Sequence, residues 1–462
     1  MFNLRWELVP YFHGRVLEIG CDRSKAFPHF LGGEECGVND PAKLDLFASK
    51  SLDAIFSPYV LASFDVARLP AIFAEWARVV KQGGHIVLYL PKDKFTKEQV
   101  VSAVRCPLID FQEDEKASFF VFRLGKAVEK KAEGKTCAVV RYGAFGDCIQ
   151  ASSILPWLKE QGYHITFYCS DHGHPVIKND PNIDRFIIQG KDEVPPEVLG
   201  DFWDYEKKKY DKWINLSESV EGTLLATPGR SNHAWPNSAR AKHMDVNYIE
   251  FTHEIAEVPP PYRPKFYSTL EERAWARKQA NQFGRRNILW SLSGSSVHKA
   301  WPWLDAVIAR IMLTYKDVDV VLVGDELSQI LETGWQKESR VHCKSGKWSI
   351  RESMAFAEVA DLIIGTETGL LNAAGSMDTP KIVTLSHSSE EMLTKHWKNV
   401  TALKQPEGKG CPIQPCRLLH YNWDHCMKHE ETGTAMCQKE IDPEMMWEAV
   451  VKVLGQPQRM VA

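Results

Sequence analysis

Short apolar runs alternate with longer amphipathic stretches along most of the chain, and this alternation is typical of an α/β protein. In the first 125 residues it predicts strands over residues 16–19, 35–38, 52–56 and 85–90, and a helix over residues 69–80. The strands are short and the helix has apolar side chains at helical spacing. We therefore expect a first α/β layer that ends near Leu124.

The same alternation starts again at Thr136 and once more after Pro264. After Thr136 it predicts strands over residues 138–141, 164–169, 186–189 and 213–216, and a helix over residues 147–161. After Pro264 it predicts strands over residues 287–291, 318–323, 361–364 and 381–385, and helices over residues 303–315, 350–360, 370–375 and 443–454. We therefore expect three α/β domains.

Two segments separate these regions. Residues 126–135 are charged, lie between glycines and show no periodicity, which is typical of a linker. Residues 258–264 are rich in proline, which is excluded from helix interiors and central strands. The predicted organisation is listed by residue number: a first domain over 1–125, a linker over 126–135, and domains over 136–262 and 263–462.

Composition narrows the class of protein. Hydrophobic residues make up 44% and charged residues 25% of the 462 positions, which is ordinary for a folded globular chain. The net charge of −4 gives no general attraction to a phosphate backbone, so nucleic acid is not the expected partner. The first residues lack the apolar core of a signal peptide, no run approaches 18 apolar residues, and the eleven cysteines are scattered. These features predict a cytoplasmic protein.

The first domain carries a strand that ends in a glycine turn, Val16-Leu17-Glu18-Ile19-Gly20-Cys21. Together with the runs at 51–57 and 75–91, it resembles the class I S-adenosylmethionine-dependent methyltransferases. That resemblance implies a Rossmann-like domain whose cofactor-site remnants are Glu18, Gly20 and Asp40. The family usually has glycine where Asp22 and Ser24 stand, and a Cβ there narrows the approach of a cofactor. We therefore expect a degenerate domain, with a working S-adenosylmethionine site as the alternative.

A second strand-glycine-helix element opens the next domain with Gly143-Ala144-Phe145-Gly146-Asp147. Gly143 and Gly146 allow a tight turn at a helix start. Asp147 suits two interpretations. It is a common helix-capping residue, and it is also a carboxylate at a loop edge, where a general base could reach a substrate hydroxyl.

The wider sequence resembles glycosyltransferase family 9, the heptosyltransferase-like enzymes. The resemblance rests on runs over residues 137–158, 179–184, 291–302 and 360–375, and it extends over about residues 136–454. It implies a GT-B pair of Rossmann-like domains and an inverting transfer from a nucleotide-sugar to a hydroxyl group, without a metal ion. In that scheme the first of the two domains holds the acceptor and the second holds the nucleotide-sugar.

The resemblance also implies roles for individual residues. Asp147 would be the base and Lys299 would contact the phosphates, with the start of the helix near Thr368 directed at the diphosphate. The other donor-side positions are Ser293, Gly294, Glu367, Thr368, Gly369 and Asn372. The acceptor-side positions are Gly143 and Gly146. Arg240 is a further acceptor-side candidate, because the stretch 230–240 looks like a loop over the cleft and a guanidinium suits a sugar or an anionic acceptor; ordinary packing of a surface loop is the alternative.

Two positions depart from the family pattern. The family commonly has aspartate where Glu367 stands and histidine where Asn372 stands. Glu367 keeps the charge, whereas Asn372 keeps hydrogen-bonding ability but cannot carry a proton. These departures leave open whether the donor is ADP-heptose, the best-known donor of the family.

Four cysteines near the carboxyl end could form a structural zinc site. Cys411, Cys416, Cys426 and Cys437 supply enough thiolates for a tetrahedral ion, but the CxxC pairs of most such sites are absent. We expect packed thiols rather than zinc.

The favoured hypothesis is an inverting glycosyltransferase that acts on a hydroxyl of a glycan-type acceptor, lipopolysaccharide-like or other. Peripheral membrane contact would then come through the acceptor. One alternative is an enzyme that also methylates its substrate with S-adenosylmethionine, and another is a phage-type glycosyltransferase acting on modified DNA bases. A carbohydrate-binding protein without catalysis is disfavoured because Asp147 and Lys299 are both present.

Overall fold

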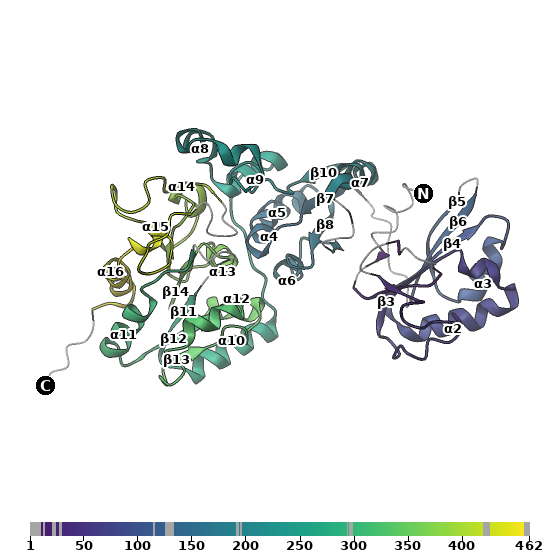
Figure 1. The fold of residues 1–462 in the computed structure, drawn as a ribbon, viewed down its shortest axis with the longest axis horizontal. Coiled ribbons are helices and arrows are strands. Elements are labelled where there is room, and N and C mark those ends of the chain that lie inside the picture. Colours follow the sequence, from purple (N-terminus) through teal and green to yellow (C-terminus); the bar gives the residue numbers. More distant parts are fainter. Residues whose placement is uncertain are drawn as a thin grey trace. The chain divides into compact units, whose positions relative to one another are not determined.

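The computed structural model describes residues 11–12, 14–20, 25–26, 30–113, 116–124, 134–190, 194, 196–292, 294, 299–418 and 426–456. The chain divides into two compact units, residues 1–138 with 186–213 and residues 139–185 with 214–462. Figure 1 shows the elements coloured along the sequence.

A six-stranded sheet in the order β2-β1-β3-β4-β6-β5 lies at the centre of the first unit. Its strands are β1 (Val16–Glu18), β2 (Leu31–Gly32), β3 (Leu52–Pro58), β4 (Val80–Pro91), β5 (Leu108–Glu113) and β6 (Ala117–Arg123). β1 to β4 pair in parallel, whereas β6 is antiparallel to both β4 and β5. Helices α2 (Leu69–Val79) and α3 (Lys97–Val104) complete the unit in Figure 1.

Helix α2 confirms the helix predicted over residues 69–80. Five large apolar side chains recur at helical spacing and are buried: Leu69, Ile72, Phe73, Trp76 and Val79. The indole Nε1 of Trp76 donates to the carbonyl of Pro41 at 2.8 Å, so the one polar atom of this large side chain is satisfied in the core.

The strand predicted over residues 35–38 is wrong. The chain turns there, because the backbone N–H of Cys36 bonds the carbonyl of Gly32 at 3.0 Å and that of Val38 bonds the carbonyl of Gly33 at 2.8 Å. The paired strand is β2, four residues earlier in the chain. Gly37 in this turn has φ +74°, a conformation that favours glycine, and the apolar pattern alone did not reveal the turn.

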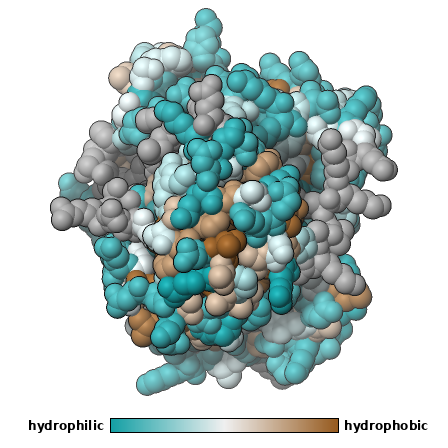
Figure 2. Space-filling view, turned by 90° about the vertical axis from the view of Figure 1, so that its right-hand side faces the viewer, coloured by the Kyte–Doolittle hydropathy of each residue, from teal (hydrophilic) through white to brown (hydrophobic). Residues whose placement is uncertain are grey.

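Figure 2 shows one face of the molecule in a space-filling view. Apolar residues gather near the middle of this face and hydrophilic residues border them. In the described part of the first unit, the large hydrophobic side chains with the greatest exposure are Leu46, Tyr59 and Val66.

A four-stranded sheet in the order β10-β7-β8-β9 follows the first domain. Its strands are β7 (Thr136–Arg141), β8 (His164–Ser170), β9 (Arg185–Gln189) and β10 (Lys212–Asn215), as predicted to within two residues. The accompanying helices are α4 (Phe145–Ala151), α5 (Leu155–Glu160), α6 (His174–Ile177), α7 (Leu199–Glu206), α8 (Asn237–Met244) and α9 (Tyr248–Ala256). The helix predicted over 147–161 is interrupted by a 3₁₀ turn at Ser152–Ile154, and α5 restarts with Pro156 in its first turn, where no N–H is required.

The third sheet is entirely parallel, in the order β13-β12-β11-β14-β15-β16. Its strands are β11 (Arg286–Ser291), β12 (Val318–Val323), β13 (Val341–Cys343), β14 (Leu362–Thr366), β15 (Lys381–Thr384) and β16 (Val400–Leu403). Its helices are α10 (Leu270–Gln282), α11 (Leu304–Thr314), α12 (Ile350–Ala357), α13 (Gly369–Ala374), α14 (Glu390–Leu393), α15 (Met436–Lys439) and α16 (Pro443–Leu454). Ser291 pairs with Gly365, and Gly365 pairs with Val383, so β11, β14 and β15 end at one edge. Ligands of open parallel sheets bind at this edge.

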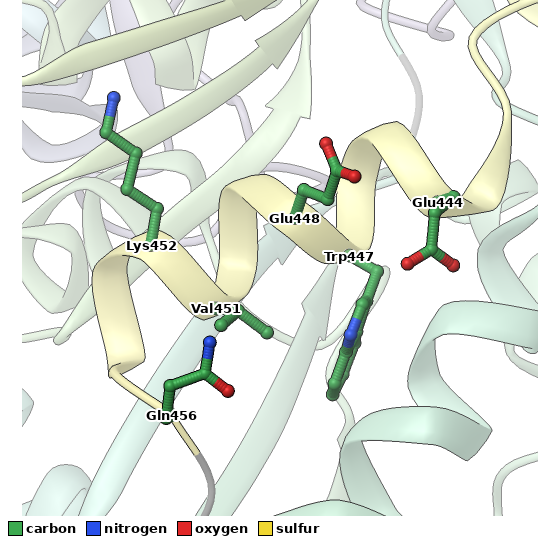
Figure 3. Close-up of a pocket in the computed structure, with 6 residues that line it drawn as sticks. All are labelled: Glu444, Trp447, Glu448, Val451, Lys452 and Gln456. Carbon is green, nitrogen blue, oxygen red and sulfur yellow. The ribbon is translucent and has the colours of Figure 1, made fainter.

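The tail helix α16 covers part of the third sheet's core with Met446, Trp447 and Val450. Figure 3 shows a surface hollow along this helix, lined by Glu444, Trp447, Glu448, Val451, Lys452 and Gln456. These residues lie apart in sequence from the strand ends that carry the predicted site. Among the described helices, none is both long enough and apolar enough to cross a membrane.

Candidate active site

Asp147 lies in the first turn of α4, directly after β7 and the glycine turn. Its Oδ2 accepts the backbone N–H of Ala144 at 2.7 Å, so one carboxylate oxygen caps the helix start. A Cβ on Gly143 would lie 2.3 Å from the Cβ of Asp147, and only glycine leaves room for this side chain. The two interpretations of Asp147 are therefore compatible, because the other oxygen, Oδ1, does not cap the helix.

Oδ1 of Asp147 faces Arg141 at the end of β7. The guanidinium Nη2 of Arg141 lies 3.1 Å from Oδ1 and 2.9 Å from both carboxylate oxygens of Glu221. The side chain of Arg141 is only 3% exposed, whereas each carboxylate is 25% exposed. Burial opposes the charge of Arg141, but the two carboxylates outweigh burial and raise its pKa above the ordinary value.

Lys299 is buried beside the carboxyl end of β14. Its Nζ donates to the backbone carbonyl of Glu367 at 3.0 Å. Burial lowers the pKa of Lys299, while Glu367 and Asp147 act in the opposite direction. A Cβ on Gly294 would lie 2.8 Å from the lysine Cδ, so this glycine lies directly against the side chain of Lys299. Ser293 lies outside the described residues.

Both oxygens of the Glu367 carboxylate are bonded to other groups of the protein. It accepts the backbone N–H groups of Ser386 and Ser388, each at 3.0 Å, and the hydroxyl of Ser386. Its Oε2 also lies 2.8 Å from Nδ1 of His387. Burial alone would raise the pKa of Glu367, but His387 and Lys299 hold that pKa well below its usual range. Glu367 therefore fixes the loop after β15 and supplies negative charge behind Lys299.

The starts of α4 and α13 touch each other through glycines. A Cβ on Gly369 would lie 2.8 Å from Phe145, and one on Gly146 would lie 2.8 Å from Nδ2 of Asn372. Asn372 accepts from Gln150 Nε2 at 2.9 Å and donates to the carbonyl of Thr368 at 3.1 Å. Asn372 thus joins the two helices. At this position the family commonly has histidine, and here the side-chain amide of Asn372 bonds the side-chain amide of Gln150.

Thr368 lies at the start of α13, as predicted, and its side chain caps this helix. Its Oγ1 accepts the N–H of Leu371 at 3.3 Å and lies 3.3 Å from the hydroxyl of Ser291. Two strand ends, β11 and β14, are thereby connected beside Lys299.

Arg240 on α8 is committed to backbone carbonyls. Its Nε donates to Cys416 at 2.9 Å, and Nη1 donates to His233 at 3.4 Å and to Trp235. The side chain is buried, and burial lowers its pKa. In this structure Arg240 braces the segment 233–235, and its predicted contact with an acceptor stays a prediction.

The three positions assigned to a cofactor remnant have protein partners or close neighbours. Glu18 is buried and accepts the N–H of Ala26 at 2.8 Å. Gly20 has φ +106°, and a Cβ there would lie 2.6 Å from Val60. Asp40 accepts the N–H of Ala42 at 3.0 Å and pairs with Arg68 at 3.2 Å, and these contacts lower its pKa. Asp22 and Ser24 lie outside the described residues.

Replacing Glu18 with glutamine should stabilise the first unit at alkaline pH. Burial raises the pKa of Glu18 to about 7 from its ordinary 4.5, outweighing the bond from Ala26 and the charge of Lys25. The protonated form therefore contributes stability below about pH 4.5 that is lost as the pH rises towards 7. Glu18→Gln should gain about 1–3 kcal/mol at pH 8 and almost nothing at pH 4.5.

Amide hydrogen exchange in β1 and β3, measured at both pH values, would report this local stability. The control is Glu34→Gln, whose side chain is exposed and should show no such pH-dependent gain. A Glu18→Gln variant equally stable to wild type at pH 8 would contradict the raised pKa.

The four cysteines of the tail are close enough to influence one another electrostatically. Burial is the main cause of the raised pKa of Cys416, about 12, and Cys411 and Cys426 add to it. The pKa of Cys437 is raised by burial and by the other three thiols. Within the described part of the chain, no group of three or more His, Cys, Asp or Glu side chains has an arrangement that could hold a metal ion.

Comparison with known proteins supports both halves of the sequence interpretation. The profile of "Glycosyltransferase family 9 (heptosyltransferase)" matches residues 206–421, and that of "Methyltransferase domain" matches residues 19–88. The chain carries a glycosyltransferase family 9 domain. The protein is therefore a glycosyltransferase with a methyltransferase-type domain before its family 9 domain. Asp147 lies outside the matched range, so its assignment rests on the geometry and on the sequence resemblance.

The chain is also similar to individual proteins and solved structures. Lipopolysaccharide heptosyltransferase 1 of Campylobacter coli is 20% identical over 281 residues, which cover 53% of this chain and 82% of that protein. The structure of a glycosyl transferase family 9 protein from Veillonella parvula has a TM-score of 0.50 at 14% identity, covering 70% of this chain and 98% of that one. E. coli ADP-heptose lipopolysaccharide heptosyltransferase II has a TM-score of 0.49 at 15% identity, covering 69% and 98%. The predicted fold class, a Rossmann-like methyltransferase-type domain followed by a GT-B pair, is confirmed.

Several residues of this site were not identified from the sequence. Arg141 and Glu221 are separated by 80 positions, and His387 lies 20 positions after Glu367. Arg141 comes directly before the glycine turn, at the buried end of a predicted strand. An arginine in such a position indicates that a carboxylate lies nearby, so the sequence could have suggested this pair. Glu221 and His387 carried no comparable signal.

Proposed function

We propose that this family 9 protein is an inverting glycosyltransferase that transfers a sugar from a nucleotide-sugar to a hydroxyl of a glycan-type acceptor. Asp147 is the base, and Lys299 neutralises the departing diphosphate. The observation that carries this proposal is the direct contact between the starts of α4 and α13, beside which Asp147 lies close enough to Lys299 for the two charges to act on each other. An inverting transfer needs a carboxylate on the acceptor side and positive charge on the leaving-group side.

The remaining donor positions fit a supporting role. Gly294 lies against both Lys299 and Thr368, Gly369 permits the close approach of α4, and Glu367 maintains the charge of the lysine. Lys299 and the backbone N–H groups of α13 would stabilise the diphosphate without a divalent ion. The donor is a nucleotide-sugar, and a panel of nucleotide-sugars would identify its nucleotide and its sugar.

The acceptor is a lipopolysaccharide-like or other glycan, so membrane contact would come through it. We place the enzyme in the cytoplasm, with domains over residues 1–125, 136–262 and 263–462. The first domain is a degenerate one, since Gly20 packs on Val60 and Asp40 is paired with Arg68. Modified DNA is a weaker acceptor candidate because the net charge is −4.

A panel of nucleotide-sugars tests the proposal directly. Thermal unfolding and donor hydrolysis should single out one nucleotide series, and a donor at one hundred times its Kd should add about 2.7 kcal/mol of stability. Lys299→Met should lose most of this stabilisation, whereas Lys316→Met, at an exposed position, should keep it. A panel in which neither nucleotide-sugars nor nucleoside diphosphates stabilise the protein would contradict the proposal.

A further inference from the structure

Two carboxylates share one buried guanidinium beside α4. Nη2 of Arg141 contacts both oxygens of Glu221 at 2.9 Å and Oδ1 of Asp147 at 3.1 Å. One guanidinium and two ionised carboxylates together carry a net charge of one negative unit. The arginine side chain is almost completely buried, so water screens these charges only weakly and the two carboxylates repel each other strongly.

Among the described residues, the charged and titratable groups that interact with Asp147 come from the segments around α4 and Lys299. Arg141 and Lys299 are the cations, and Glu221 is the other carboxylate. The thiol of Cys148, on the same helix, also interacts with Asp147, and Cys169, on β8, acts on Cys148. Burial raises the pKa of both thiols, to about 12 for Cys169, so they are neutral at ordinary pH. Glu221 is therefore the single anionic neighbour that acts on Asp147 among these groups.

An aspartate paired with a buried arginine alone is a poor base, because the cation stabilises its ionised form. A second carboxylate on the same guanidinium offsets that stabilisation. Burial and Asp147 together raise the pKa of Glu221 despite Arg141, which shows the same repulsion from the other side. The guanidinium also keeps a partner when Asp147 becomes neutral, so no unpaired buried charge is created.

We propose that Glu221 is a positioning residue that acts through Arg141 to keep Asp147 a sufficiently strong base. This inference rests on the proposed function. In the transfer step the acceptor oxygen forms a bond to the anomeric carbon and its proton passes to Asp147. The bond from that carbon to the diphosphate oxygen breaks, and its electron pair leaves with the nucleoside diphosphate. Glu221 exchanges no proton and remains on Arg141 throughout.

Carboxyl-carbon NMR of the unliganded protein tests the inference independently of turnover. In protein labelled at aspartate Cγ and glutamate Cδ, Asp147→Asn and Glu221→Gln assign the two signals. In wild type both signals should respond to each other's titration. In Glu221→Gln the Asp147 signal should respond at lower pH than in wild type, because one like charge has been removed. The control, Glu218→Gln, changes a 57% exposed carboxylate in the same segment and should leave Asp147 unchanged.

Kinetics provide the second measurement once a donor is known. The acidic limb of the kcat/KM profile should move to lower pH in Glu221→Gln, with about a tenfold lower kcat. Glu221→Asp keeps the charge and should restore the wild-type midpoint, which a purely structural role would not achieve. If Glu221→Gln does not fold, the mutual response of the two carboxyl signals in the wild-type protein still decides whether Glu221 acts on Asp147.

Two results would overturn the inference. One is an Asp147 midpoint that is the same in Glu221→Gln and in wild type. The other is a loss of transfer in Glu221→Gln as large as that in Asp147→Asn, which would make Glu221 the base. If wild type accepts no nucleotide-sugar, the proposed function fails while the NMR titration still decides the coupling.

Discussion

Asp147→Asn is expected to lower the rate of glycosyl transfer by about 10²–10⁴-fold, the usual contribution of a general base. The amide can still accept the N–H of Ala144 through its oxygen, so the start of α4 should persist. It cannot take a proton from the acceptor, and it removes the charge that faces Arg141. Steady-state transfer and donor binding, measured on the same preparation, would separate the two effects.

Donor binding should change little in this variant, because Lys299 and the start of α13 remain. Asp171→Asn is the matched control, since Asp171 is an exposed aspartate just after β8 and should retain full activity. Turnover by Asp147→Asn at a tenth of the wild-type rate or more would remove Asp147 from the role of base. Loss of donor binding together with turnover would point instead to a collapsed site.

Much of the fold could be predicted because its signals are local. The buried strands of the parallel sheet are nearly continuous apolar runs, as for Val318–Val323, and α2 shows apolar residues at helical spacing. β13 and β16 were not predicted, because runs of three and four residues of mixed polarity carry little periodicity. A turn that depends on a glycine with positive φ, as at Gly37, is also not revealed by the apolar pattern.

The candidate site could be predicted only in part from the sequence, for a different reason. Asp147 and Lys299 stand in recognisable runs, but the groups that set their charge come from distant segments. Glu221 reaches Arg141 from a loop after β10, and His387 reaches Glu367 from the loop after β15. Pairing across such separations follows from the order of strands in a sheet, which one sequence does not specify. The departure at Asn372 is explained only by its bond to Gln150, 222 positions away.

Glu367→Gln is expected to destabilise the second unit by about 3–5 kcal/mol at pH 7, the usual effect of removing one member of a buried charged pair. Glutamine offers one acceptor oxygen where the carboxylate serves two N–H groups, a hydroxyl and His387. It also withdraws the charge that raises the pKa of Lys299 against burial, so diphosphate binding should weaken as well. Urea denaturation followed by circular dichroism would measure the stability change.

The pH dependence makes this prediction more specific. Glu367 has a lowered pKa in the folded protein, so its charge contributes stability above its ordinary value of 4.5 and loses that contribution as the pH falls further. The difference between wild type and Glu367→Gln should therefore be full at pH 7 and should narrow below about pH 4.5. Glu390→Gln, a 54% exposed partner of Lys404, should change stability by less than about 0.5 kcal/mol at either pH. A constant difference between pH 7 and pH 4 would show that Glu367 acts through packing alone, and the charge that it holds behind Lys299 would then have no energetic role.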